Sequence, residues 1–199
     1  EGEWVRNSQL MKLDSLAADW KFLGFPQLSR LVNNSFVDNH FVTELYESEI
    51  SSYDTAIGAC SLPGLFGFGS EQSSLPLPAY LKVDPVDIDR WRQRLAAISA
   101  TKQVFGFTWF GGGNSMSRRR RSMQLDDLYP LFSLPGTTWV SLQYGGLETQ
   151  HELEQFSGKT GIKLHSFPDT CIDLYEQAAL CKALDLTVSV QQTVAHVAG

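Results

Sequence analysis

Short runs of β-branched and aromatic residues recur along the second half of the chain, and stretches with helical spacing separate them. Each run has the length and composition of a buried strand. The four runs are residues 104–110, 138–143, 162–165 and 186–190. The intervening stretches predict helices at 125–132, 148–156 and 172–184, and residues 193–199 begin another. Alternation of strands with helices predicts an α/β fold in which a parallel sheet is covered by helices.

The first half of the chain has a less regular pattern. Apolar residues at mixed helical spacings over residues 9–31 predict one or two amphipathic helices, interrupted at the Gly-Phe-Pro of residues 24–26. Residues 33–35 have the composition of a turn, and 36–43 that of a strand. Residues 53–60 predict a short buried strand.

A polar stretch with two prolines, residues 70–84, has the composition of a connection between domains. Asp84 is placed to cap a helix that Pro85 opens and that runs through Ile98. We therefore expect three segments. They are a partial N-terminal domain (1–84), a linker helix (85–101) and a partial C-terminal domain (102–199).

Composition narrows the classes of function. Hydrophobic residues make up 43% and charged residues 19% of the 199 residues, which favours a folded chain over a disordered one. The formal net charge of −6 argues against a general nucleic-acid partner, although a local basic cluster could hold one phosphate. Three dispersed cysteines suit a reducing compartment, and the four histidines lack metal-ligand spacing. We expect no metal and no other cofactor.

No apolar stretch approaches the ~20 residues that cross a bilayer, and the first residues do not resemble a signal peptide. We therefore expect a cytoplasmic protein without a membrane span.

Ligands of parallel sheets bind outside the carboxyl ends of the strands, which directs attention to the loops 111–121, 143–146 and 191–196. The glycine-rich start of the first loop would let backbone N–H groups approach an anion, although such a turn is more often only a turn. The arginine run 118–121 is most simply a solvated loop, from which we expect Arg121 to reach the ligand. His196, in the first turn of the last helix, either faces a phosphate or serves as a packing or capping residue. No general base is identifiable.

Several segments, which occur in the same order along the chain as in the family, resemble a known family. Residues 184–199 (LDLTVSVQQTVAHVAG) are similar to the "Leu-Asp-Leu, strand, Asp-Thr, two residues, His-Leu-Ala-Gly" motif of heptosyltransferase-like glycosyltransferases. That motif belongs in particular to the glycosyltransferase-like domain that follows tetratricopeptide repeats in many bacterial proteins. The other similar segments are FTWFG at 107–111, RSMQL at 121–125, VSLQYG at 140–145, and the upstream YD, CSLP and PAYL at 53–54, 60–63 and 78–81.

The resemblance covers about residues 36–199 and implies two Rossmann-like halves of the GT-B type that face each other across a cleft. Both halves would be incomplete here, with the chain cut short at both ends. The first would face an unknown acceptor, and the second would bind a nucleotide-diphosphate-sugar donor without an obligatory metal. Tetratricopeptide repeats would adjoin them in the full-length protein.

By the same resemblance, Arg121 and Ser122 would lie near the donor phosphates and Gln143 near the nucleotide, while Thr193 and His196 would stand at the phosphate-facing helix start. The substrate-binding set that we expect is Gly111, Gly112, Asn114, Arg121, Ser122, Gln143, Tyr144, Gln191, Gln192, Thr193 and His196.

The chain departs from the family at two positions of this set. Gln191-Gln192 replaces the Asp-Thr pair, and Tyr144 stands where Lys is common. These departures keep open a second hypothesis, that the domain is a non-catalytic nucleotide-sensing or scaffolding module. A third hypothesis is that the arginine run binds nucleic acid or another acidic partner, and the acidic overall charge argues against it.

Overall fold

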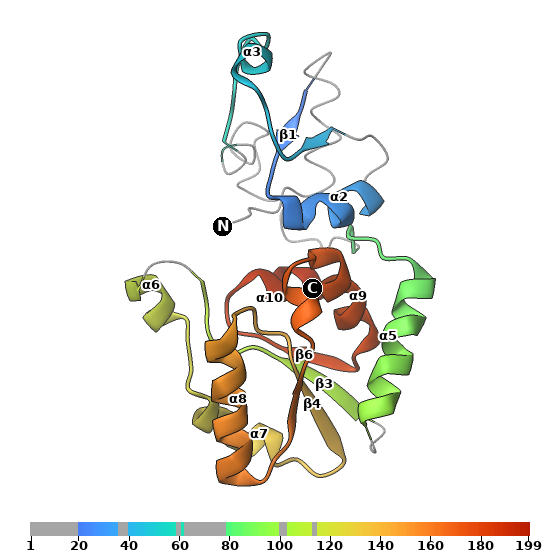
Figure 1. Ribbon diagram of the computed structural model, residues 1–199, viewed down its shortest axis with the longest axis vertical. Coiled ribbons are helices and arrows are strands. Elements are labelled where there is room, and N and C mark those ends of the chain that lie inside the picture. Colours follow the sequence, from blue (N-terminus) through green and yellow to red (C-terminus); the bar gives the residue numbers. More distant parts are fainter. Residues whose placement is uncertain (1–19, 36–39, 59–60, 62–78, 100–102, 113–114) are drawn as a thin grey trace, which may run out of the picture. The chain divides into compact units, whose positions relative to one another are not determined.

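The computed structural model describes residues 20–35, 40–58, 61, 79–99, 103–112 and 115–199 (Figure 1). The chain forms two compact units, Glu1–Lys82 and Val83–Gly199. Both are of the α/β class, with parallel strands and flanking helices, as the sequence predicts.

The first unit contains a strand–helix–strand motif. Strand β1 (Phe22–Leu23) pairs in parallel with β2 (Phe41–Val42). The connection between them contains a short 3-10 helix, η1 (Pro26–Leu28), followed by helix α2 (Ser29–Ser35). Helix α3 (Glu47–Ile50) follows β2. Three apolar side chains of the motif are buried, namely Leu28, Leu31 and Phe41.

Two local predictions in this unit are wrong because tertiary partners decide the backbone. Residues 22–23, predicted as helix, form a strand since β2 is there to pair with them. Residues 33–35, predicted as a turn, are the last residues of α2. There Asn34 Nδ2 donates to the Lys82 carbonyl at 2.8 Å, and Lys82 N donates to Ser35 Oγ at 2.9 Å. Side chains that would otherwise compete with a helix are used by a distant segment.

The strand predicted over residues 53–60 is also absent from its described part, 53–58. Ile57, the largest apolar side chain expected inside, is 49% exposed. A short apolar run becomes a strand only where another strand pairs with it, and none of the described strands does so here. Residues 59–60 lie outside the described ranges, as do the predicted helical residues 9–19 and the strand residues 36–39.

The second unit is built on a four-stranded, all-parallel sheet in the order β5-β4-β3-β6. All four predicted strands are confirmed, although their ends shift by a few residues. The strands are β3 (Gln103–Phe107), β4 (Thr137–Ser141), β5 (Leu164–Ser166) and β6 (Leu186–Val188). The chain runs outward from β3 through β4 to β5 and then crosses back to the other side of β3.

Helices cover both faces of this sheet (Figure 1). One face is covered by α5 (Pro85–Ile98), α9 (Leu174–Ala183) and α10 (Thr193–Ala198). The other is covered by η4 (Leu125–Leu128), α7 (Tyr129–Phe132) and α8 (Leu147–Thr160). Two short helices, η5 (Pro168–Cys171) and α6 (Ser115–Arg120), were not predicted. Within the described ranges, no helix has both the length and the apolar character needed to cross a membrane.

Strand β3 shows how the pattern of side chains produces the two layers. Successive residues of a strand point to opposite faces. Phe105 and Phe107 therefore pack toward α7 and α8, whereas Val104 packs toward α5 and α9. Gly106 shares the face of Val104, where a Cβ atom would lie 2.6 Å from Leu142 Cδ1. Glycine at this position lets the sheet and the α9 side pack closely.

Local capping fixes the ends of the long helices. Asp84 Oδ1 accepts from Val86 N at 2.8 Å, with Pro85 at the first helical position, as predicted. Asp173 caps α9 by the same type of bond, to the backbone N–H of Tyr175. Helix α8 ends at Gly161, whose φ of 74° is the left-handed conformation that glycine supplies at helix ends.

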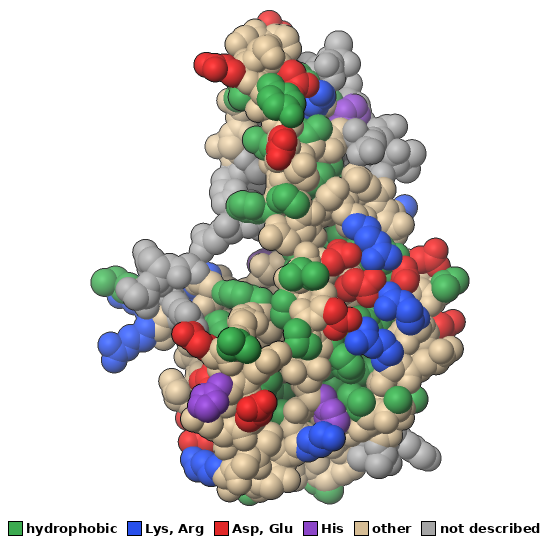
Figure 2. All heavy atoms as spheres, in the orientation of Figure 1, with side chains coloured by type: hydrophobic (Ala, Val, Ile, Leu, Met, Phe, Trp, Pro, Cys, Tyr) green, Lys and Arg blue, Asp and Glu red, His purple; other side chains and the backbone are tan. Residues whose placement is uncertain are grey.

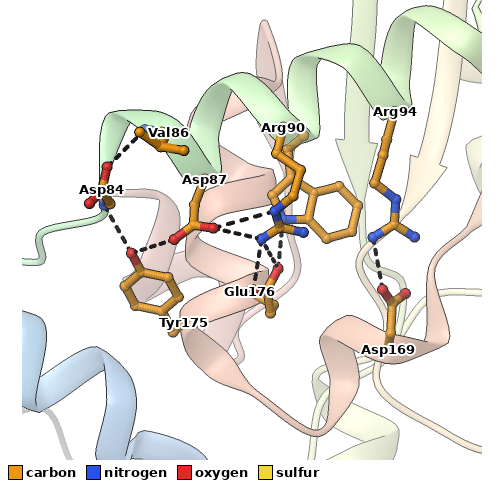
Figure 3. Close-up of polar contacts among 9 residues, drawn as sticks. Asp84, Val86, Asp87, Arg90, Arg94, Asp169, Tyr175 and Glu176 are labelled. Atoms are coloured by element: carbon orange, nitrogen blue, oxygen red, sulfur yellow. Dashed lines mark hydrogen bonds and ion pairs between the residues drawn. The ribbon is translucent and has the colours of Figure 1, made fainter.

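Polar contacts join α5 to α9, so the helix expected as a linker belongs to the second unit (Figure 3). Glu176 Oε2 accepts from Arg90 Nη2 at 2.7 Å and from Trp91 Nε1 at 2.9 Å. Asp87 accepts from Arg90 Nη2 at 3.0 Å and from the Tyr175 hydroxyl at 2.9 Å. The hydrogen bonds to Glu176 and then Asp87 raise the pKa of Arg90 above its ordinary value.

Candidate functional site

Strands β3 and β6 are neighbours in the sheet, and the connections that follow them go to opposite faces. The loop after β3 leads to η4 and α7 on one face, whereas the loop after β6 leads to α10 on the other. The point between the ends of these two strands is therefore a switch point of the sheet. In doubly wound sheets, ligands bind in the crevice at such a switch point. Here the loops after β3 and β6 meet closely. A Cβ atom on Gly111 would lie 3.2 Å from the Gln191 carbonyl oxygen and 3.0 Å from Arg121 Cβ. Two of the three predicted loops therefore converge at one place.

Polar residues extend the pairing of β3 with β6 up to this point. Thr108 N donates to the Val188 carbonyl at 3.0 Å, and the Thr108 hydroxyl lies 2.9 Å from Ser189 Oγ. Val190 N donates to Thr108 Oγ1 at 3.2 Å. Sequence reasoning did not select Thr108 or Ser189. The available signal was a hydroxyl residue near the carboxyl end of each of these two strand runs.

The segment after Gly111 leaves the sheet edge and returns to it. Its two ends are joined, because Gly111 N donates to Ser122 Oγ at 3.2 Å and Arg121 Nη2 donates to the Gly112 carbonyl at 2.5 Å. Between them the chain forms α6 (Ser115–Arg120), where a loop was expected. Arg121 is half-buried and lies at the site, so the guanidinium brings positive charge to the meeting point of the loops.

Gln143, expected near the nucleotide, is buried with 4% exposure and holds the β3 loop in place. Its Oε1 accepts from Trp109 N and from Phe110 N, each at 3.1 Å. The carbonyl oxygen of Gln143 accepts from Cys171 Sγ at 3.6 Å. Burial raises the pKa of the Cys171 thiol, which keeps this donor protonated. In this arrangement Gln143 shapes the loop through its side-chain oxygen.

Tyr144 brings the loop after β4 to the same place. Its side chain is 39% exposed, and its hydroxyl oxygen would lie 2.7 Å from a Cβ atom on Gly112. Its ring meets Phe110 edge-on, with centroids 5.7 Å apart. Gly145 follows with a φ of 146°, and a Cβ there would overlap the Thr149 hydroxyl. Only glycine fits this turn, which is what lets α8 start directly after the site.

Gln192 has the most unusual environment of the expected residues. It is 7% exposed, and within the described part of the chain its Nε2 and Oε1 are the buried side-chain atoms that have no hydrogen-bond partner. It precedes α10 without capping it through its side chain. Leaving a buried polar group unpaired costs about 1–3 kcal/mol. Polar groups of a ligand are natural partners for an amide in this position.

The expected residues thus divide into four groups. Seven form one set through the contacts above. They are Gly111, Gly112, Arg121, Ser122, Gln143, Tyr144 and Gln191. Gln192 and Thr193 follow this set directly in the chain, whereas His196 is exposed in the last turn of α10. Asn114 lies outside the described residues.

The loops at the switch point carry no carboxylate. The carboxylate of Glu152, on α8, accepts a hydrogen bond from Trp109 Nε1 at 3.1 Å, which joins α8 to the loop after β3.

Burial, and then the charge of Lys163, lowers the pKa of His165 on β5, away from these loops. Among the described residues, no group of three His, Cys, Asp or Glu side chains is placed to hold a metal ion. The electrostatic character of the site therefore comes from Arg121 and from backbone and amide dipoles.

Comparison with curated proteins gives a match to Protein FlbA of Caulobacter vibrioides, which is 28% identical over 123 residues. The matched region is 61% of this chain and 20% of FlbA, so the chain spans only a small part of that relative. No family model matches the chain. No solved structure matches it.

Proposed function

We propose that Val83–Gly199 is the donor-binding half of a glycosyltransferase that takes a sugar from a nucleotide-diphosphate sugar. The proposal extends to the first unit, whose β1–α2–β2 motif would belong to the acceptor-side Rossmann-like half of a GT-B arrangement. The acceptor is unassigned, and tetratricopeptide repeats would adjoin the domain in the full-length protein.

The observation that carries the proposal is the convergence of the β3 and β6 loops at the switch point of the parallel sheet. Gly111, Arg121 and Gln191 are in contact there, and the buried amide of Gln192 comes next in the chain. Glycine lets a ligand approach the backbone, and arginine supplies positive charge for phosphate. Tyr144 adds an exposed aromatic ring beside Gly112, on which a planar group could pack.

In the proposed reaction, the bond between the sugar's anomeric carbon and the donor's phosphate oxygen breaks. A nucleophilic atom of the acceptor forms the new bond to that carbon and loses its proton to a base. The nucleoside diphosphate leaves with the bonding electron pair. Arg121 would stabilise the charge that develops on this leaving group. The Gln192 amide would both donate to and accept from hydroxyl or base groups of the donor. We assign no catalytic residue.

Thermal unfolding of the full chain tests binding. UDP, GDP, ADP, CDP and a sugar conjugate of each would be added separately. A ligand at a hundred times its Kd stabilises a protein by about 2.7 kcal/mol. We expect the compounds that carry one particular nucleotide base to raise the Tm of the wild type and of Arg92→Ala, but not the Tm of Arg121→Ala. Arg92 is a matched control, since it is exposed and its ion-pair partner among the described residues is Asp89, on its own helix. If no compound raises the Tm, the proposal fails.

A second candidate function is a non-catalytic module that senses a nucleotide or serves as a scaffold. The observation in its favour is that the loops at the switch point carry no carboxylate to act as a base, with amides at 191 and 192 instead. The two functions share the binding site and differ in turnover. Release of free sugar, or transfer to any acceptor, by a full-length protein that contains this domain would exclude the second candidate.

A further inference from the structure

Helix α6 presents one face with exposed basic side chains. Met116 is 70% exposed, and Arg119 and Arg120 are also exposed. These residues are three and four positions apart, so they lie on the same side of the helix. Neither Arg119 nor Arg120 has a hydrogen bond or an ion pair with any residue that the structure describes.

The arginines of α5 are in a different situation. Each of them has a carboxylate partner, at distances of 2.7–2.8 Å. The pairs are Arg90 with Glu176, Arg92 with Asp89, and Arg94 with Asp169. Figure 2 shows the mixture of blue and red over α5, and the blue side chains of α6 at the left margin. Arg119 and Arg120 of α6 thus differ from the three arginines of α5, each of which has a carboxylate partner.

Hydrogen bonds hold both ends of the segment that carries α6. Arg121 Nη2 donates to the Gly112 carbonyl, and Met123 N donates to the Trp109 carbonyl at 2.7 Å. Between these anchors α6 packs extensively against no other described element and projects from the body of the unit (Figure 1). A helix of six residues gains little stability by itself in water. Its exposed face is therefore available to a partner next to the candidate site.

We propose that this face of α6, made of Met116, Arg119 and Arg120, binds an acidic segment of a partner protein. Arginine forms paired, parallel hydrogen bonds with carboxylates, and the methionine offers an adaptable apolar contact. This interaction goes beyond the proposed donor site and requires no nucleotide.

The charge distribution selects a short acidic peptide over a long polyanion. Residues 83–199 carry eleven basic and twelve acidic side chains, and four of the eleven are consecutive at 118–121. The remainder of the unit is therefore strongly acidic and repels nucleic acid, which would extend beyond α6. A peptide can place its carboxylates on α6 alone. The apolar side chain of Met116 also matches a peptide better than a phosphate backbone.

Fluorescence anisotropy with the full chain tests this inference. The probe is a fluorescein-labelled peptide of alternating glutamate and serine with one central leucine. Arg119→Gln/Arg120→Gln removes the two charges, and Lys163→Gln/Lys182→Gln removes the same charge from exposed sites elsewhere in the unit. We expect the α6 variant to raise the Kd by about tenfold or more, and the control variant to leave it within about twofold.

Replacement of the leucine by serine is expected to weaken binding to the wild type, and added salt to weaken it further. A labelled single-stranded oligonucleotide is expected to bind more weakly than the peptide at physiological salt. The inference is overturned if the peptide does not bind the wild type, if both variants lose it equally, or if the oligonucleotide binds more tightly. Circular dichroism of both variants confirms that the comparison is between folded proteins.

Discussion

At the scale of single residues, Gln191 and Gln192 are identical neighbours in opposite environments. Gln191 is exposed, whereas the amide of Gln192 is buried and has no partner among the described residues. Burial of an unpaired amide lowers stability, and a native protein keeps such a group where it serves another purpose. Because the two residues are of the same type and differ in burial, they form a natural pair for comparison.

Replacement of Gln192 by methionine is expected to stabilise the ligand-free chain. Methionine has a similar size and no group that must be hydrogen-bonded, so the free energy of unfolding should rise by about 1–2 kcal/mol. Urea denaturation measures this change, and Gln191→Met should stay within about 0.5 kcal/mol of the wild type. The same Gln192→Met variant should lose the Tm response to the nucleotide ligand. A clear loss of stability in Gln192→Met would contradict the conclusion that the buried amide of Gln192 has no hydrogen-bond partner among the described residues.

Cys181 should make the stability of the chain depend on alkaline pH. Burial raises the pKa of the Cys181 thiol to about 12, and a hydrogen bond with Thr187 partly opposes this rise. In the unfolded chain the thiol ionises near its ordinary pKa of 9.0. The stabilisation is therefore complete below about pH 9 and is lost as the pH rises toward 12, because the unfolded state ionises first.

The measurement is the urea midpoint at pH 7.5 and pH 10 for the wild type and for Cys181→Ala. We expect the wild type to lose about 1 kcal/mol more than the variant between these two conditions. An equal loss in both proteins would show that Cys181 does not contribute to the alkaline instability.

At the scale of elements, the contact of α5 with α9 combines apolar burial with a polar edge. Trp91 is fully buried, and its Nε1 donates to Glu176. Arg94 lies over the Trp91 ring, with its guanidinium carbon 4.0 Å from the ring centroid. The indole of Trp91 is thus covered by the Arg94 guanidinium and hydrogen-bonded to the Glu176 carboxylate. These contacts explain why α5 packs as part of the second unit.

Loss of Glu176 should weaken this contact between the two helices. Glu176→Ala leaves the buried indole N–H of Trp91 without its acceptor and removes one of the two carboxylate partners of Arg90, so we expect a loss of about 1–3 kcal/mol in the free energy of unfolding. Asp89→Ala is the control on α5, because the Asp89–Arg92 pair is more than 60% exposed and should contribute less than about 1 kcal/mol. Equal effects of the two substitutions in chemical denaturation would refute the structural role of Glu176.

At the scale of the whole molecule, the second unit contains its own cores. One core lies between the sheet and α7 and α8, and the other lies between the sheet and α5, α9 and α10. Every residue of both clusters belongs to Val83–Gly199. The unit has caps on its long helices and an unbroken set of parallel strand pairs.

Val83–Gly199 produced alone is therefore expected to fold. We predict a single cooperative transition in thermal and urea unfolding, with a free energy of unfolding in the range of about 5–15 kcal/mol that is usual for domains. Dispersed amide signals in a proton NMR spectrum would accompany it. A broad, non-cooperative transition would show instead that this unit requires Glu1–Lys82.

Local chemistry in the sequence was sufficient to predict most elements of the second unit. Its central strands, β3 and β4, contain buried residues and lie in β-branched and aromatic runs, and its long helices carry caps within a few residues of their ends. The same reasoning failed for residues 33–35 and 53–58, where the backbone depends on a partner distant in sequence. It also missed α6, because an arginine run at a loop position gives no periodic apolar signal.

The sequence alone determined that the second half of the chain forms a helix-covered parallel sheet and which loops follow its strands, because periodicity and capping are local properties. Only the tertiary structure decided which loops meet. Strand order brings Gly111 against Gln191 and Arg121, buries Gln192 without a partner, and uses Gln143 to hold a loop. Those outcomes depend on contacts between residues 10 to 80 positions apart, and a one-dimensional pattern carries no information on such contacts.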